Sequence, residues 1–248
     1  MENYLWRINK EKLKETNLTK YSNFLKKNYK FEGDKDFNKI WRWSIDHPVI
    51  FWKSIWDFTK IKGEMGKNLF KKSDIFFKNR FFPEAKLNYA ENLLKKNNNE
   101  LAIIFKSENG YKNSLSWKNL NSKVAQISGW MKEAGIKKND RVAAYLPNIP
   151  ETVIAYISTS ALGAIWSSCS PDFGKAGVID RFSQISPKIL FIVDKYFYNG
   201  KKINVIERLP EIINKIPSIK KIVLVAYPGT PIEKNKKYKL EIYSWEDL

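Results

Sequence analysis

Hydrophobic side chains in the first quarter of the chain recur with a helical period. Between residues 21 and 60, aromatic and aliphatic residues return to one face every three or four positions. The period breaks at Asp46-His47-Pro48, where Asp46 can serve as an N-cap and Pro48 is tolerated only in a first helical turn. The pattern predicts successive helices that bury an aromatic core, with a new helix beginning at this break.

Beyond residue 100 the pattern changes to short apolar runs separated by helical periods. One helical period ends at Gly135 and another, Pro150 to Leu162, ends at Gly163. Weaker helical patterns cover residues 180–185 and 203–213. Apolar runs separated by helices are typical of buried parallel strands joined by right-handed crossovers. The runs are Leu101–Phe105, Val142–Leu146, Ala164–Ser168, Ile189–Val193 and Ile222–Ala226.

A polar stretch separates the two patterns. Residues 61–84 predict irregular structure, Leu87 to Lys95 a short helix, and the sequence KKNNNE at residues 95–100 a linker. The sequence therefore predicts an α/β protein, in which a helical N-terminal cap region, residues 1–95, is followed by a parallel-sheet α/β domain, residues 96–248.

The end of the chain resembles the first turn of a helix. Ser244 could cap this turn, and Asp247, three residues later, could reach back to the cap. Because no residue continues this helix, we expect the α/β domain to be incomplete within these 248 residues.

The formal net charge of +18 would suit a nucleic-acid or membrane partner. Only six of the 44 basic residues are arginine, however, and arginine is favoured for reading bases and for gripping phosphates with two hydrogen bonds. The lysines are scattered as short pairs such as Lys26-Lys27 and Lys137-Lys138. This distribution favours a solvated surface, and we expect neither a nucleic-acid nor a membrane partner.

Cysteine and histidine each occur once, which limits the available chemistry. Cys169 cannot form an internal disulfide, and His47 cannot build a histidine-rich metal site. The N-terminus carries charges at short intervals and lacks the apolar stretch of a signal peptide. The uncharged stretch from Thr152 to Pro171 is rich in serine and predicts a buried helix followed by a buried strand. We therefore expect a cytoplasmic protein.

Catalytic signatures are absent from the sequence. The eleven glycines are never adjacent and never spaced as GxG, so there is no Walker loop, no dinucleotide fingerprint and no Ser/Thr/Gly-rich phosphate loop. His47 precedes a proline and Cys169 lies in an apolar run, so we expect both to be structural. Nothing near His47 resembles a nucleophile elbow, and we assign no catalytic or metal-binding residue.

Three segments resemble the acid:CoA ligases among the adenylate-forming enzymes. FPEAKLNYAENLL, residues 82–94, is similar to the run that closes the N-terminal cap of acetoacetate:CoA ligases. DRVAAYLPNIPE, residues 140–151, is similar to a strand and turn shared by many members, with Asn139 where glycine is common. LGAIWSSCSPDFG, residues 162–174, resembles the acetoacetate branch, whereas acetate and propionate ligases carry an FGGFSPE version. The resemblance covers residues 20–248 and implies the fold of these enzymes.

This resemblance implies a two-step reaction that forms acetoacetyl-CoA. ATP and acetoacetate would give an acyl-adenylate and pyrophosphate, and the thiol of CoA would then displace AMP, while Mg²⁺ offsets the phosphate charge. By resemblance, every group that the family uses for the first step lies beyond Leu248. We therefore expect this chain alone to be inactive, and to act with the missing C-terminal part of the same enzyme.

The resemblance also implies a CoA-binding surface. By position, Trp166, Ser167, Ser168, Tyr198 and Lys201 would lie near the adenine and the 3′-phosphate of CoA. Lys201 would pair with the phosphate, and Trp166 or Tyr198 would contact the base. Tyr198 stands where the family often carries arginine, which removes one charge contact.

Other functions remain open from the sequence. The acid could be acetate, propionate or a longer acyl chain, because the residues of the substrate pocket lie mostly beyond Leu248 by resemblance. The chain could also be a CoA-binding module without catalysis, or it could use its positive charge to bind nucleic acid.

Overall fold

The structure is a computed structural model that describes residues 5–33, 36–232 and 241–248. Contacts divide the chain into two compact units, Met1–Leu87 and Asn88–Leu248, which are called unit 1 and unit 2 below. The domain boundary between residues 95 and 96 that the sequence suggests stays a prediction. Each unit is described by itself.

Unit 1 is built mainly from helices that share a small aromatic core. Tyr21, Leu25, Phe31 and Ile40 are its buried residues, and rings from the helices pack around them, as Tyr21 and Phe58 do at a centroid distance of 5.0 Å. The elements are α1 (Lys10–Glu15), α2 (Asn17–Tyr29), α3 (Phe37–Asp46), α4 (Pro48–Thr59), the two short strands β1 (Phe70–Lys71) and β2 (Arg80–Phe81), and the 3₁₀ turn η1 (Phe76–Lys78) between them.

The predicted helix break is confirmed, but its predicted cap is wrong. α3 ends at Asp46 and α4 begins at Pro48. The residue that precedes the proline is His47, which therefore occupies the N-cap position and makes no side-chain capping bond. Asp46 instead lies in the last turn of α3, where its carboxylate is 3.5 Å from the Nε of Arg42.

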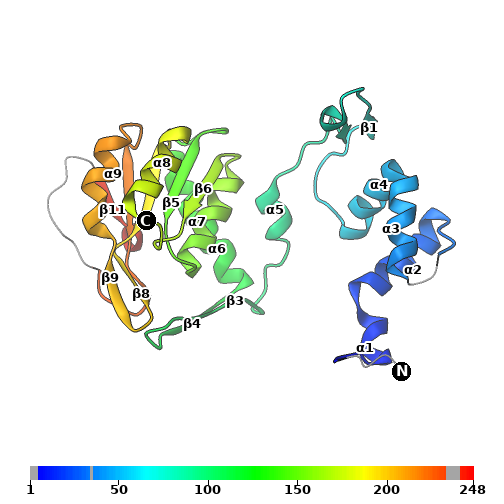
Figure 1. Ribbon diagram of the computed structural model, residues 1–248, viewed down its shortest axis with the longest axis horizontal. Coiled ribbons are helices and arrows are strands. Elements are labelled where there is room, and N and C mark those ends of the chain that lie inside the picture. Colours follow the sequence, from blue (N-terminus) through cyan, green and yellow to red (C-terminus); the bar gives the residue numbers. More distant parts are fainter. Residues whose placement is uncertain (1–4, 34–35, 233–240) are drawn as a thin grey trace. The chain divides into compact units, whose positions relative to one another are not determined.

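Unit 2 contains a sheet of five parallel strands in the order β11-β10-β7-β5-β6 (Figure 1). Four of these strands coincide with predicted apolar runs, which confirms the α/β class. The fifth strand, β11, was not predicted, because its short mixed sequence EIYS is only half-buried. The strands are β5 (Arg141–Tyr145), β6 (Ile165–Cys169), β7 (Ile189–Val193), β10 (Lys221–Val225) and β11 (Glu241–Ser244).

One predicted sheet strand lies elsewhere, and another is less buried than expected. The run at Leu101–Phe105 forms β3 (Leu101–Lys106), which pairs antiparallel with β4 (Lys112–Ser116) in a separate two-stranded ribbon. A ribbon leaves one face open, and Ile104 is accordingly 69% exposed. The predicted buried strand β6 is an edge strand, and its Ile165 is 49% exposed.

Helices cover both faces of the parallel sheet. α6 (Trp117–Glu133) and α7 (Pro150–Ala161) pack together on one face, and α8 (Lys175–Ile185) and α9 (Leu209–Lys215) on the other (Figure 1). The predicted glycine stops are confirmed, because Gly135 and Gly163 follow α6 and α7 with φ of +85° and +66°.

The weak helical prediction at 203–213 is only partly right. Its first residues belong to β9 (Lys201–Asn204), which pairs antiparallel with β8 (Lys195–Tyr198), and the 3₁₀ turn η2 (Ile206–Arg208) leads into α9. A short helix, α5 (Tyr89–Leu93), lies inside the predicted segment at 87–95.

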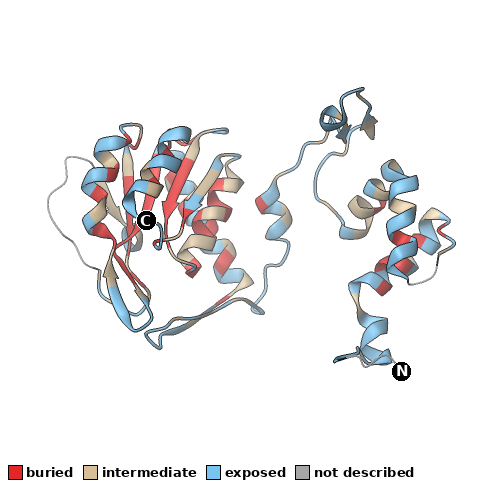
Figure 2. Cartoon of the chain, viewed as in Figure 1, coloured by how far each residue is buried: buried red, intermediate tan, exposed pale blue. Residues whose placement is uncertain are grey.

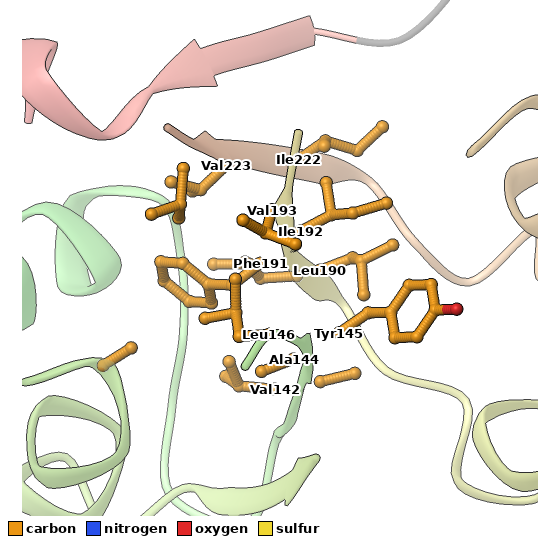
Figure 3. Packing of buried hydrophobic residues seen from close by; sticks show 14 of the residues in the cluster. Val142, Ala144, Tyr145, Leu146, Leu190, Phe191, Ile192, Val193, Ile222 and Val223 are labelled. Carbon is orange, nitrogen blue, oxygen red and sulfur yellow. The ribbon is translucent and has the colours of Figure 1, made fainter. Parts of the chain in front are cut away.

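The hydrophobic core of unit 2 is centred on β7, whose five residues are buried to 1% exposure or less (Figure 2). Side chains of β5 and β10 extend this core on either side of β7 (Figure 3). Phe191 also contacts the rings of Trp166 and Trp245, at centroid distances of 6.4 and 6.0 Å. The sheet is therefore held by one continuous apolar cluster.

The predicted helical turn after Ser244 is present, with Ser244 in its N-cap position, but the predicted capping bond is not formed. Residues Trp245–Asp247 form a single 3₁₀ turn, η3, directly after β11. The hydroxyl of Ser244 makes no capping bond to the backbone and instead donates to Oε2 of Glu246, at 2.5 Å. Within the described residues, no helix combines the length and hydropathy that crossing a membrane requires.

Candidate functional site

The topology of the sheet points to the carboxyl ends of β5 and β7. The chain passes from β5 to β6 on one side and then returns to β7 on the other side of β5. In open α/β sheets, ligands bind outside the carboxyl ends of the strands, at the point where the strand order reverses. Tyr145 ends β5, and Asp194 follows β7 directly, so these two residues mark the candidate site.

A buried ion pair follows the last residue of β7. Asp194 and Lys195 are 0% and 3% exposed, and Nζ of Lys195 lies 3.1 Å from Oδ2 of Asp194. Oδ1 of Asp194 accepts the backbone N–H groups of Lys195 at 2.7 Å and of Tyr227 at 2.9 Å. Nζ of Lys195 also donates to the carbonyl of Pro231, at 2.8 Å. The pair thus ties the end of β7 to the segment that follows β10.

A second polar cluster fastens the loop between β6 and α8. Nη1 of Arg208 donates to the hydroxyl of Tyr145 and, at 2.9 and 3.2 Å, to the carbonyls of Pro171 and Phe173. The Tyr145 hydroxyl also lies 2.5 Å from the carbonyl of Phe173, and Figure 3 shows it pointing away from the apolar cluster. Burial raises the pKa of Tyr145, while the Arg208 guanidinium acts in the opposite direction.

Tyr196 of β8 completes this cluster. Burial, together with a hydrogen bond to the carboxylate of Asp172, raises the pKa of Tyr196 to about 12. Asp172 in turn accepts a hydrogen bond from the hydroxyl of Ser170, at 2.8 Å. The phenol of Tyr196 therefore stays protonated at neutral pH and serves as a hydrogen-bond donor.

Three of the predicted site residues lie on the edge strand β6. The indole of Trp166 packs against Tyr156 of α7 and Phe191 of β7, at centroid distances of 6.0 and 6.4 Å. Ser167 is half-buried and Ser168 is exposed. The strand therefore offers Ser168 freely to a ligand, whereas much of Trp166 is engaged by the fold.

The other two predicted residues lie together at the end of a hairpin. Tyr198 and Lys201 are cross-strand partners in the β8–β9 ladder. They flank the turn residues Asn199 and Gly200, whose φ values are +50° and +73°. Tyr198 is 63% exposed, Lys201 is exposed and has no ionic partner among the described residues, and the N–H of Gly200 donates to Oε1 of Glu108 at 2.7 Å.

The structure brings each of these two groups together but keeps the groups apart. Trp166 pairs with Val142, which pairs with Ile189, the first residue of β7. The hairpin begins beyond Asp194, five residues further along β7, and five strand residues span about 16 Å. Along the strand direction the start of the hairpin therefore lies about 16 Å beyond Trp166, whereas Ser168 is level with Phe191, three residues before Asp194.

Sequence reasoning did not assign the roles of Tyr145, Asp172, Lys195, Tyr196 and Arg208. Lys195 had a usable signal, because a charged pair that directly follows a fully apolar strand marks the carboxyl edge of a parallel sheet. Arg208 had none, since it reaches Tyr145 from a turn 63 residues away.

Two hollows in the described part of the chain lie away from the predicted residues. One, of about 410 Å³, lies over the β3–β4 ribbon. The other, of about 350 Å³, is lined in part by Lys123, Glu151 and Trp245. Burial raises the pKa of Glu151, whose Oε2 has no hydrogen-bond partner among the residues that the structure describes. No group of three or more His, Cys, Asp or Glu residues is placed to hold a metal ion within the described residues.

Comparison with known proteins gives a family match over most of unit 2. The profile of the family described as AMP-binding enzyme matches residues 90–246. The chain is similar to a Rhizobium meliloti protein named acetoacetyl-coenzyme A synthetase, with 40% identity over 194 residues, covering 78% of this chain and 30% of that protein. It is also similar to a Xenopus tropicalis acetoacetyl-CoA synthetase, with 37% identity, covering 77% of this chain and 29% of that protein.

A solved structure resembles nearly the whole chain. The acetoacetyl-CoA synthetase from Streptomyces lividans matches with a TM-score of 0.87 and 27% identity, covering 98% of this chain and 37% of that one. The chain thus spans about 30% of the length of the curated relatives that it matches.

The buried ion pair predicts a large effect of a single substitution. Lys195→Met would leave the Asp194 carboxylate buried without its cation, so we expect the free energy of unfolding of unit 2 to fall by about 3–5 kcal/mol. Lys201→Met, on the same hairpin but exposed, is the matched control and should change it by no more than about 0.5 kcal/mol. Denaturant unfolding at neutral pH measures both, and equal stabilities of the two variants would contradict the assigned role.

Tyr196 predicts a loss of stability in alkali. A phenol with a pKa near 10 in the unfolded chain releases its proton there before the native protein does, so its contribution is complete below pH 10 and is lost as the pH rises toward 12. The shift corresponds to about 2–3 kcal/mol. Tyr196→Phe should therefore flatten the decline of unfolding free energy between these pH values. Tyr198→Phe controls for loss of a hydroxyl, and a decline that Tyr196→Phe leaves unchanged would refute the prediction.

Proposed function

The chain belongs to the AMP-binding enzyme family, and from that premise we propose that it forms part of an AMP-forming acid:CoA ligase that makes acetoacetyl-CoA from acetoacetate, ATP and CoA. The observation that carries this proposal is the series of relatives named acetoacetyl-CoA synthetase, which match about three quarters of the chain. The SSCSPDFG string at residues 167–174 supports the same branch.

The reaction proceeds in two substitutions. A carboxylate oxygen of acetoacetate attacks the α-phosphorus of ATP. The bond between this phosphorus and the oxygen bridging to the β-phosphate breaks, and pyrophosphate leaves. The sulfur of CoA then attacks the acyl carbon, a thioester forms, and AMP leaves as the C–O bond breaks. Mg²⁺ supplies charge neutralisation for the triphosphate when it is bound, although the described residues form no metal-ligating group of their own.

The proposed role of this chain is to bind CoA, the substrate of the second step. Its sequence carries no glycine-rich phosphate loop, so the groups that activate ATP are expected from the part of the relatives' length that this chain does not match. The chain's own contribution is a rigid sheet edge and a hairpin on which CoA can lie.

The residues proposed to contact CoA are Trp166, Ser167, Ser168, Tyr198 and Lys201. The exposed ammonium of Lys201, which has no ionic partner among the described residues, suits a phosphate, and the exposed ring of its cross-strand partner Tyr198 suits a base. Ser168 can donate a hydrogen bond from the edge strand, whereas Trp166 would contact CoA only through the part of its ring that Tyr156 and Phe191 leave open. The buried Asp194–Lys195 pair holds the hairpin that carries Tyr198 and Lys201.

Acid specificity has a named alternative. A Penicillium aethiopicum relative, malonamoyl-CoA synthetase vrtB, is 30% identical over 232 residues and covers 90% of this chain. Malonamic acid and acetoacetic acid share a carbonyl group β to the carboxylate, so a 3-oxo acid is the substrate class common to these relatives.

A non-catalytic CoA-binding module is the second candidate function, which the lack of a phosphate loop favours. We place the protein in the cytoplasm, where a single free, buried Cys169 stays reduced.

The proposed division of labour predicts activity only in a longer polypeptide. We expect no ATP–pyrophosphate exchange from the 248-residue chain, and acetoacetate-dependent AMP formation with ATP, Mg²⁺ and CoA once the unmatched part is supplied. That part can come from the adjoining reading frame or from the Rhizobium relative. Exchange by the chain alone would overturn the division, and a longer form that uses acetate or malonamate but not acetoacetate would overturn the proposed substrate.

The hairpin predicts a phosphate-specific effect on CoA binding. Lys201→Met should weaken binding of CoA about tenfold, because one charge-assisted contact is lost, and should leave binding of 3′-dephospho-CoA unchanged. Lys137→Met, at an exposed lysine of unit 2, is the matched control. Calorimetry on the folded chain gives the dissociation constants of CoA and of 3′-dephospho-CoA. An equal loss for the two ligands would contradict the phosphate contact, and no loss for either would remove Lys201 from the site.

A further inference from the structure

The segment between β1 and β2 is a small, ordered hairpin on unit 1. Phe70 pairs with Phe81 across its two-residue ladder, and their rings lie 4.9 Å apart. Trp52 of α4 contacts Phe81 at 5.9 Å, and Trp56 contacts Phe82 at 5.3 Å. The base of the hairpin is therefore fixed to α4 by four aromatic residues and their contacts.

Hydrogen bonds also order the far end of this hairpin. The side chain of Asn79 accepts the N–H of Ser73 at 2.8 Å, and the N–H of Lys78 donates to the carbonyl of Ile75 at 2.9 Å. These bonds close the 3₁₀ turn η1. Residues 72–79 are called the Phe tip below.

The Phe tip presents large apolar side chains to solvent. Phe76 and Phe77 are 89% and 80% exposed, and Ile75 is 43% exposed. The rings at the base of the hairpin pack against neighbours, whereas the two tip rings have no ring contact among the described residues. Apolar side chains that gather on an exposed surface, rather than being scattered singly, point to an interaction site.

Positive charge surrounds these apolar side chains. Lys71, Lys72, Lys78 and Arg80 are all exposed, and none forms an ion pair within the described residues. Asp74 is the acidic residue in this stretch, so residues 71–80 carry a net charge of +3 (four cations less one anion). An apolar end with a basic rim is complementary to a surface that is apolar inside and anionic outside.

We propose that the Phe tip inserts into the interface of an anionic phospholipid membrane and holds unit 1 at its surface. Phe76 and Phe77 would enter the boundary between headgroups and acyl chains. The flanking lysines and Arg80 would lie among the anionic headgroups, with their aliphatic stems along the apolar surface.

The small size of the tip favours a membrane over a protein partner. A stable protein–protein interface needs roughly 800 Å² from each side, formed by about 20–30 residues. Three exposed apolar residues on a turn are far fewer than that number. Shallow insertion needs only a few apolar side chains together with electrostatic attraction, and such combined signals give reversible anchoring.

This surface contact differs from what the charge alone suggested. The scattered lysines favoured a solvated surface and no membrane partner, and the structure contains no helix suited to spanning a bilayer within the described residues. The sequence predicted residues 61–84 to be irregular, so the ordered exposure of two adjacent rings became visible only in the folded hairpin. The proposal concerns binding at the surface and needs no span.

Vesicle binding tests the proposal directly. The 248-residue chain is mixed with vesicles of phosphatidylcholine alone or of phosphatidylcholine with phosphatidylglycerol, and the bound fraction is measured by co-sedimentation over a range of salt. We expect binding to the anionic vesicles that weakens as salt rises. Phe76→Ala combined with Phe77→Ala should reduce this binding at least about tenfold, without moving the thermal unfolding midpoint, because the two rings contact little in the free protein.

Matched variants separate insertion from general adsorption by a cationic protein. Lys71→Ser with Lys72→Ser should weaken binding to anionic vesicles, whereas Lys137→Ser with Lys138→Ser removes the same charge from unit 2 and should leave it nearly unchanged. Ile104→Ala, at a side chain 69% exposed on the β3–β4 ribbon, controls for loss of an exposed apolar group.

Three outcomes would overturn the proposal. One is absence of binding to either vesicle, and another is equal binding by the parent chain and the double phenylalanine variant. The third is a protein partner: the double variant keeps vesicle binding but loses association with the supplied remainder of the ligase. The first two results leave the proposed ligase activity untouched, because that activity is measured without lipid, whereas the third would assign the tip to the contact between this chain and the remainder of the ligase.

Discussion

Burial of β7 on every side is the constraint on which the arrangement of unit 2 depends. The strand has a hydrogen-bonded neighbour on each edge, β5 and β10, and helices over both faces. Water does not reach its peptide groups, so each must find its partner within the sheet. A slip of one residue would turn Leu190 and Ile192 to the opposite face, and the register is therefore strongly specified. That register decides which side chains leave the sheet together at its carboxyl edge.

Polar groups begin at the point where the pairing of β7 ends. Removing Asp194 and Lys195 from water costs several kcal/mol per ion, and their attraction offsets this only with further hydrogen bonds. Here both ions have such bonds, to Tyr227 and Pro231. The main effect of the pair is geometric, since it joins the end of β7 to the segment after β10. Arg208 does the same for β5 and the β6–α8 loop, so hydrogen bonds position the loops at this edge.

The alternation of apolar runs and helical periods along the sequence predicted the strands of the core. Rules based on a few neighbouring residues failed where contacts with distant parts of the chain determine the structure. Apolar runs with helices between them identified β5, β7 and β10, because burial on two faces leaves little choice of side chain, and they also identified the edge strand β6, which is less buried. The run at Leu101–Phe105 looked the same but forms a ribbon, since nothing in a run of five residues specifies its pairing partner. Asp46 and Ser244 are good caps by residue type, yet α4 begins at Pro48 with His47 in the N-cap position, and Ser244 precedes the turn η3 without forming a capping bond. Arg208 acts over a sequence distance that no local pattern can report.

Because β6 is an edge strand, its residues can contact a ligand, whereas the residues of the buried central strand β7 cannot. Among the described residues β6 pairs only with β5, so its outer backbone groups and Ser168 stay accessible. The β8–β9 hairpin stands beyond the carboxyl edge and offers Tyr198 and Lys201. Under the proposed CoA role, both groups serve the adenine and 3′-phosphate end of the ligand. Tyr198 and Lys201, side by side at the end of the hairpin, suit the base and the phosphate of one nucleotide, and Ser168, the accessible serine nearest the carboxyl end of β6, is the β6 residue best placed to join them.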